Sequence, residues 1–183
     1  MAETVYLRRT LENAIDTECN LIGVIDQTHH KVHAGKHFIY SAIMTATAST
    51  DAMNVFIKAG NSTDPERHYT FEISADKAGA VYLQEDVLSS GGGGTTVDFI
   101  NSKRTADDTT VYDLELQPTT FSSDTADLLY GAMIGANLAP VRIGGTAGNR
   151  EEFILKSSVD YLLRFEPTLA ATKVLLVSKF YEE

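Results

Sequence analysis

Residues 151–183 read EEFILKSSVDYLLRFEPTLAATKVLLVSKFYEE, and this stretch decides the fold. It predicts three consecutive strands. Side chains of a strand point alternately to two faces, so Tyr161, Leu163 and Phe165 are expected to share one face. Pro167 ends that strand because proline has no N–H to donate to a neighbour. The run 174–177 is apolar at every position, which predicts a central strand buried on both faces. The chain should therefore end inside the fold.

Upstream of this stretch, short apolar or alternating runs recur at intervals of roughly eight to fifteen residues, separated by turn residues. The strands predicted from these runs are residues 20–26, 36–48, 53–59, 69–73, 80–84, 97–101 and 111–117. The turn DKAG (76–79) predicts that 69–73 and 80–84 form a hairpin. Residues 124–140 fit a helix or a strand, and Gly131 and Gly135 favour a strand with a bend.

No convincing long helix accompanies these runs. The pattern predicts an all-β protein, an antiparallel β-sandwich or jelly roll, with an N-terminal arm. Residues 1–30 are expected to hold the arm and a first strand, and 31–183 the sandwich domain. Residues 2–20 fit either a weak helical stripe or an extended arm, and we favour an arm that packs on the body or on a neighbouring subunit.

Charge narrows the classes of partner. The 183 residues include 15 Lys and Arg against 25 Asp and Glu, a formal net charge of −10. Proteins that bind nucleic acid neutralise phosphates with clustered cations, so we expect no nucleic-acid partner and no anionic-membrane partner. The single cysteine, Cys19, excludes an internal disulfide. With no apolar run of transmembrane length and no signal-peptide pattern, we expect a soluble protein of a reducing compartment.

Four histidines lie close together, at positions 29, 30, 33 and 37. The spacing of His29, His33 and His37 would place three imidazoles on one helix face, which suggests a metal site. Gly35 argues against a continuous helix, and a strand is predicted to begin at Phe38. We therefore interpret these histidines as turn and strand residues, and we predict no metal.

Signatures of catalysis are missing. The sequence contains neither G-x-S-x-G nor H-E-x-x-H. The glycine-rich stretch 89–96 lacks the Lys and Ser/Thr that follow a phosphate-binding loop, so it is interpreted as a surface hairpin loop. Cys19 in an arm is a poor nucleophile candidate, and Asp107-Asp108 is interpreted as solvated charge. We predict no catalytic residue, no cofactor and no enzymatic activity.

Several segments, in order, resemble one family. They are His33-Ala-Gly35-Lys36-His37-Phe38 at the start of a strand, Asn101-Ser-Lys103-Arg104-Thr105, the run from Gly144 to Lys156 (GGTAGNREEFILK), Tyr161–Arg164, and Phe180-Tyr181-Glu182. Together they resemble the head decoration (cement) proteins of tailed bacteriophages, over roughly residues 31–183. The loop that is commonly Asn-Asn-Asn-Arg in that family is Asn-Ser-Lys-Arg here, and the chain has no tryptophan.

The resemblance implies a non-enzymatic β-sandwich protein of the virion, made in the host cytoplasm and placed on the outer surface of the expanded capsid. Its implied partners are the major capsid protein and itself, as a homotrimer. The arm and the polar loops are the expected contacts with the capsid or a neighbouring subunit: Val5, Tyr6, Leu7, Arg8, Arg9, Lys103, Arg104 and Arg150. The alternative is a glycan- or receptor-binding fibre module, which exposed aromatic side chains in the loops would favour.

Overall fold

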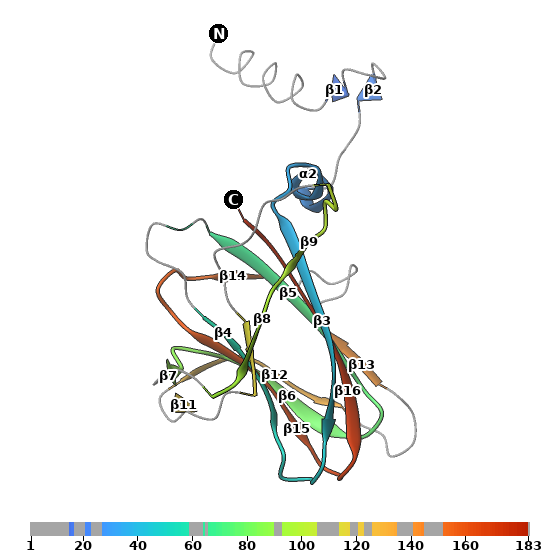
Figure 1. Cartoon of the computed structure of the whole chain (residues 1–183), viewed down its shortest axis with the longest axis vertical. Helices are drawn as coiled ribbons and strands as arrows, with labels where there is room; N and C mark the ends of the chain where they lie inside the picture. The colour runs from blue at the N-terminus through green and yellow to red at the C-terminus, as the bar shows by residue number, and fades with distance from the viewer. Residues whose placement is uncertain are drawn as a thin grey trace.

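In the computed structural model, the chain forms two antiparallel sheets packed face to face as a β-sandwich (Figure 1). The structure describes residues 15–16, 21–22, 27–58, 64, 66–89, 93–105, 114–117, 121–122, 126–134, 141–144 and 152–182. One sheet, the β16 sheet, has the strand order β13-β5-β16-β3-β9, with β14 also paired to β5. The other, the β15 sheet, has the order β12-β6-β15-β4-β10-β8. The all-β prediction is confirmed.

The strand bounds follow the apolar and alternating runs of the sequence. In the β16 sheet the strands are β3 (His37–Ala46), β5 (Arg67–Ala75), β9 (Ile100–Asn101), β13 (Val141–Gly144), β14 (Phe153–Leu155) and β16 (Thr172–Glu182). In the β15 sheet they are β4 (Met53–Ile57), β6 (Gly79–Glu85), β8 (Thr95–Val97), β10 (Leu114–Leu116), β12 (Asp127–Ile134) and β15 (Tyr161–Pro167).

The strand order is that of a jelly roll. Four couples of strands pair in antiparallel fashion: β3 with β16, β4 with β15, β5 with β13 and β14, and β6 with β12. Successive couples lie alternately in the two sheets. An antiparallel ribbon rolled up in this way gives a double-sheet jelly roll.

Between β6 and β12 the chain adds further strands to this frame. β8 and β10 extend the β15 sheet beyond β4, and β9 extends the β16 sheet beyond β3. β7 (Leu88–Ser89) and β11 (Phe121–Ser122) form a separate two-stranded sheet. Close to this insertion, Phe56, Val87 and Leu162 form a small apolar cluster, so part of the outer face of the β15 sheet is also buried.

The main core lies between the sheets. Tyr161, Leu163 and Phe165 of β15 are at most 1% exposed and join this core, which confirms that they share a face. From the other sheet, Phe38 and Phe180 stack in the core with ring centroids 5.2 Å apart. The predicted three C-terminal strands are thus present as β14, β15 and β16.

β16 lies at the centre of its sheet, but over residues 174–177 only one of its faces is fully buried. Leu176 is fully buried, whereas Leu175 is 42% exposed, and its partner across the ladder, Ile43, is 76% exposed. The prediction of burial on both faces is therefore wrong for run 174–177. A continuous apolar run does not separate a two-sided core strand from one that presents an apolar outer face to solvent.

Two predicted hairpins are wrong. β5 and β6 lie in different sheets, so the DKAG turn carries the chain across the sandwich and does not join paired neighbours. Likewise, the strands on either side of the glycine-rich stretch pair elsewhere, β7 with β11 and β8 with β10. The ambiguous stretch 124–140 contains a strand, β12, with an irregularity in its pairing between Leu128 and Tyr130.

Near the N-terminus the structure differs from the expected turn. Residues Gln27–His33 form a short helix, α2. This helix spans the expected boundary between the N-terminal part (1–30) and the sandwich domain (31–183). The interpretation of His29, His30 and His33 as turn and strand residues is wrong, whereas His37 does begin β3. β1 (Ile15–Asp16) and β2 (Leu21–Ile22) pair only with each other among the described strands, so the first strand of the sandwich is β3.

Candidate interaction surface at the α2 end of the sandwich

Gly35 fixes where α2 ends. Its φ is 74°, a left-handed conformation that glycine adopts without steric cost. The N–H of Lys36 donates to the carbonyl of Lys31 (2.9 Å) and the N–H of Gly35 donates to that of Val32 (3.1 Å). These two bonds form a Schellman motif, which satisfies carbonyls that the helix end leaves free. The glycine that argued against a helix in the sequence is therefore the residue that terminates one.

The C-terminal strand is tied to this helix. Lys31 Nζ donates to the carbonyl of Glu182 (3.1 Å) and lies 5.9 Å from the centroid of the Tyr181 ring. The N–H of Glu182 donates to the carbonyl of Lys36 (3.0 Å). Figure 1 shows α2 and the C-terminus at the same end of the sandwich. The end of the chain and the start of the jelly roll thus hold each other in place.

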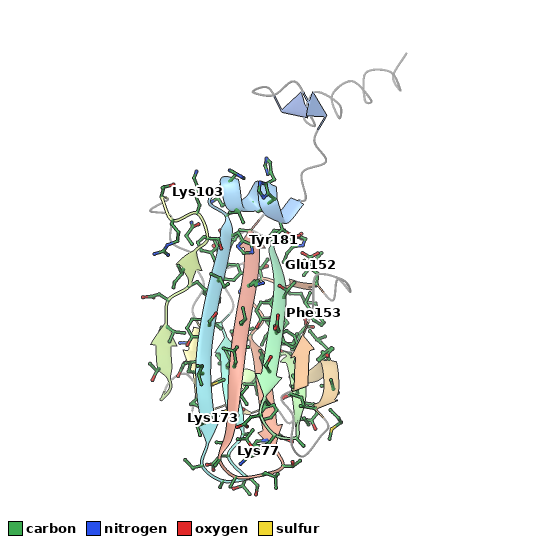
Figure 2. All side chains as sticks on the ribbon, turned by 90° about the vertical axis from the view of Figure 1, so that its right-hand side faces the viewer. Lys77, Lys103, Glu152, Phe153, Lys173 and Tyr181 are labelled. Atoms are coloured by element: carbon green, nitrogen blue, oxygen red, sulfur yellow. The ribbon has the colours of Figure 1, made fainter. Side chains whose placement is uncertain are left out.

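Behind this contact, His68 stacks on Tyr181 with ring centroids 4.4 Å apart and 9° between the planes. The Nδ1 atom of His68 lies 3.1 Å from Glu152 Oε1, so β5, β16 and the residue before β14 meet here (Figure 2). These groups are largely buried and serve to connect strands at this end.

The turn after β9 is held against the helix end by side-chain hydrogen bonds. Asn101 Nδ2 donates to the carbonyl of Gly35 (2.8 Å), and Asn101 Oδ1 accepts from the N–H of Lys103 (2.9 Å). The N–H of Ser102 donates to the carbonyl of His37 (2.9 Å), while Ser102 Oγ and His37 Nδ1 lie 2.6 Å apart. Burial, and then the charge of Lys179, lower the pKa of His37, which keeps the imidazole neutral for this bond at pH 7.

Residues 27–36 and 101–105 together form what we term the α2 surface. These two segments contain four cations, Lys31, Lys36, Lys103 and Arg104, and no carboxylate. Lys36, Lys103 and Arg104 are exposed. In a chain of net charge −10, this is a local cationic surface. Figure 2 shows Lys103 beside α2, and Lys77 and Lys173 at the opposite end of the sandwich.

Two of the predicted contact residues, Lys103 and Arg104, thus lie together on an anchored, exposed turn. Val5, Tyr6, Leu7, Arg8, Arg9 and Arg150 lie outside the described residues. The sequence prediction did not include α2 or the bonds that Asn101 and Ser102 make to it. The signal was present in the His33–Phe38 segment, where Gly35 follows a possible helix and so predicts a helix C-terminus.

A second polar cluster lies at the start of β15, around a buried carboxylate. Glu85 Oε2 accepts from the Tyr161 hydroxyl (2.8 Å) and Oε1 accepts from Lys156 Nζ (2.5 Å). Burial raises the pKa of Glu85, but the hydrogen bonds from Lys156 and Tyr161 and the charge of Lys156 outweigh it, and the pKa falls below its ordinary value. Burial and the same carboxylate raise the pKa of the Tyr161 hydroxyl. The cluster links β6 to β15 and holds Glu85 ionised.

This cluster predicts a pH dependence of stability. Without these contacts the pKa of the Glu85 carboxyl would be 4.5, and in the folded chain it is lower. The stabilisation that Glu85 gives to the fold is therefore complete above pH 4.5, and it is lost as the pH falls through the folded pKa. Glu85→Gln should lower the free energy of unfolding at pH 7 by about 1.5–3 kcal/mol. The deficit should shrink towards pH 3 in urea unfolding series.

Glu166→Gln is the matched control. Glu166 is on β15, the strand of Tyr161, its side chain is 43% exposed, and its partner is Arg164 (2.8 Å). Exposed pairs contribute about 0–1 kcal/mol, so this variant should follow the wild-type pH profile closely. A constant deficit for Glu85→Gln from pH 7 to pH 3 would contradict the assignment.

Among the described residues, no group of three or more His, Cys, Asp or Glu side chains is placed to hold a metal ion. No helix in the part of the chain that the structure describes is long and apolar enough to cross a membrane. No family model matches the sequence, and neither a curated protein nor a solved structure matches the chain.

Proposed function

We propose that this chain is a structural virion protein that binds the outer surface of the expanded head of a tailed phage and stabilises it. The observation that carries the proposal is the contact between two segments of the family pattern. Segment 33–38 and segment 101–105 are far apart in sequence, yet they are joined by the bonds from Asn101 and Ser102 to Gly35 and His37. A pattern whose parts converge on one exposed surface is typical of a binding surface.

The α2 surface suits contact with an acidic partner. Three of its four cations, Lys36, Lys103 and Arg104, are exposed. The turn that carries Lys103 and Arg104 is held by backbone and side-chain bonds, so little ordering entropy is lost on binding. A cationic patch on an acidic protein orients the approach to a negatively charged site on the major capsid protein. Each contact can be weak, because many copies act on one lattice.

We further propose that the protein binds the capsid as a homotrimer. A three-fold ring needs a heterologous interface, in which each subunit contributes two different surfaces. Two apolar surfaces are available. On β12, Leu128 is 59% and Met133 is 70% exposed, and on the β16 sheet Ile43 is 76% and Ile100 is 50% exposed. The expected solution mass is three times the 20.0 kDa of the chain.

The test of the capsid contact is a charge reversal. Expanded capsids that lack the protein are titrated with wild type and with the double variant Lys103→Glu/Arg104→Glu, and occupancy and capsid melting are measured. Wild type should bind saturably and raise the melting temperature. The variant should bind at least about tenfold more weakly, since close charge pairs across an interface are coupled by about 1.5–7 kcal/mol.

Lys77→Glu/Lys173→Glu is the matched control, with the same change of charge at the opposite end of the sandwich (Figure 2). This control should bind like wild type. Equal weakening by both double variants would mean that only net charge matters, and no saturable binding by wild type would overturn the proposed function.

A further inference from the structure

Two exposed imidazoles lie in direct contact on α2. His29 and His33 are four residues apart, so they lie on the same face of the helix. Their Nε2 atoms are 2.9 Å apart and their ring centroids 4.5 Å apart. At this distance one Nε2–H donates to the other Nε2, so both nitrogens point at the same small region of space.

We propose that His29 and His33 form a bidentate site for a divalent transition metal ion of the Cu²⁺, Ni²⁺ and Zn²⁺ class. Imidazole nitrogens bind these ions at about 2.0–2.1 Å, and two such nitrogens in cis positions at a right angle are about 2.9 Å apart. The separation in the structure matches this spacing, so binding requires little change in the distance between the two nitrogens. The ion takes the place of the shared proton, which moves to Nδ1 of the same neutral ring through solvent. Water or another donor fills the remaining positions.

The other histidines of the chain do not share this geometry. His30 is next to His29 in sequence and therefore lies on a different side of the helix. His37 is buried with its Nδ1 on Ser102, and His68 is buried against Glu152 and Tyr181. Only the pair on one face of α2 combines exposure with convergent nitrogens among the described residues.

Such a site would act as a clamp on α2. A helix of seven residues is marginal by itself, and an ion that bridges residues one turn apart stabilises the helical form over the open one. The amides that close the helix end are those of Ala34, Gly35 and Lys36, which donate to the carbonyls of His30, Val32 and Lys31. Their hydrogen exchange therefore reports whether the metal is bound at this place.

The experiment is a titration of the full chain with Ni²⁺ by calorimetry, in a Cys19→Ser background that removes the only thiol. Wild-type histidines should give saturable binding with one ion per chain, and Ni²⁺ should slow exchange at residues 34–36. His29→Ala and His33→Ala should each weaken binding at least about tenfold, because loss of even an outer-shell partner typically costs 10–100-fold in metal affinity.

His30→Ala is the matched control, since it removes an exposed imidazole from the same helix without touching the pair. This variant should bind Ni²⁺ as the parent does. The proposal is overturned if the parent shows no saturable binding, if either pair variant binds as tightly as the parent, or if His30→Ala loses as much affinity as they do. Folding of each variant is checked by circular dichroism. Because the side chains of His29, His30 and His33 are all exposed, their removal should leave the fold intact, so a loss of Ni²⁺ affinity reports on the site itself.

Discussion

Leu176→Asp should leave the chain unfolded at 25 °C. Leu176 is fully buried on β16, between Ala42 of β3 and Ile73 of β5. Loss of a buried leucine side chain costs about 2–5 kcal/mol, and taking a carboxyl group out of water at the same place adds several more. The sum is comparable to the whole stability of a typical domain, about 5–15 kcal/mol. Circular dichroism and urea titration measure the outcome.

Leu175→Asp is the matched control for this variant. It is the next residue on the same strand, it points to the outer face, and it is 42% exposed. Surface substitutions usually change stability by about 0.5 kcal/mol or less, so this variant should remain folded. If both variants fold with similar stability, Leu176 does not lie in the core, and the described packing of the inner face of β16 against the β15 sheet is wrong.

The sequence predicted well the elements whose signal is local. Tyr161, Leu163 and Phe165 alternate with Leu162, Arg164 and Glu166, and the period of two predicts that the first three share a face, which is the core face in the structure. The sequence could not show which sheet the next strand joins. The DKAG turn looks the same whether it joins neighbours in one sheet or crosses the sandwich, because the difference depends on pairing with β15 and β16, about a hundred residues further on.

In the candidate site, too, the local features could be predicted from the sequence and the long-range contacts could not. Lys103 and Arg104 were predicted as contacts because they lie in a polar loop, within one of the segments that carry the resemblance. Their position beside α2 depends on the bond from Asn101 to Gly35, 66 residues earlier, which no local pattern reveals. Glu115 is a similar case. It is almost fully buried, and its carboxylate accepts from the Gly94 N–H (2.6 Å) and pairs with Lys58 (3.3 Å). Its position between Leu114 and Leu116 in the predicted strand 111–117 puts it on the opposite face from them, but no local pattern shows what covers that face.

Removing residues 2–20 should leave a folded sandwich that binds capsids poorly. The deletion takes away β1, whose only partner among the described strands is β2, and it leaves every strand of the two large sheets and α2 in place. Urea unfolding should therefore give nearly the wild-type stability. Under the proposed function, binding should weaken by about 10²–10⁴-fold, because the arm and the α2 surface would act on one capsid as two linked contacts.

The reason for a large effect is that the arm would reach a neighbour by strand addition, which forms main-chain hydrogen bonds that the body cannot replace. Arg8→Glu/Arg9→Glu in the full chain separates charge from strand pairing, and a loss smaller than that of the deletion would indicate that the main chain carries most of the contact. The deletion combined with Lys103→Glu/Arg104→Glu tests the linkage. The charge reversal is compared in two backgrounds, the full chain and the chain without residues 2–20. If the arm and the α2 surface are separate contacts joined only by the chain, the charge reversal should weaken the intrinsic affinity by the same factor in both backgrounds. A deleted chain that decorates capsids as well as wild type would show that the capsid contact lies in the body alone.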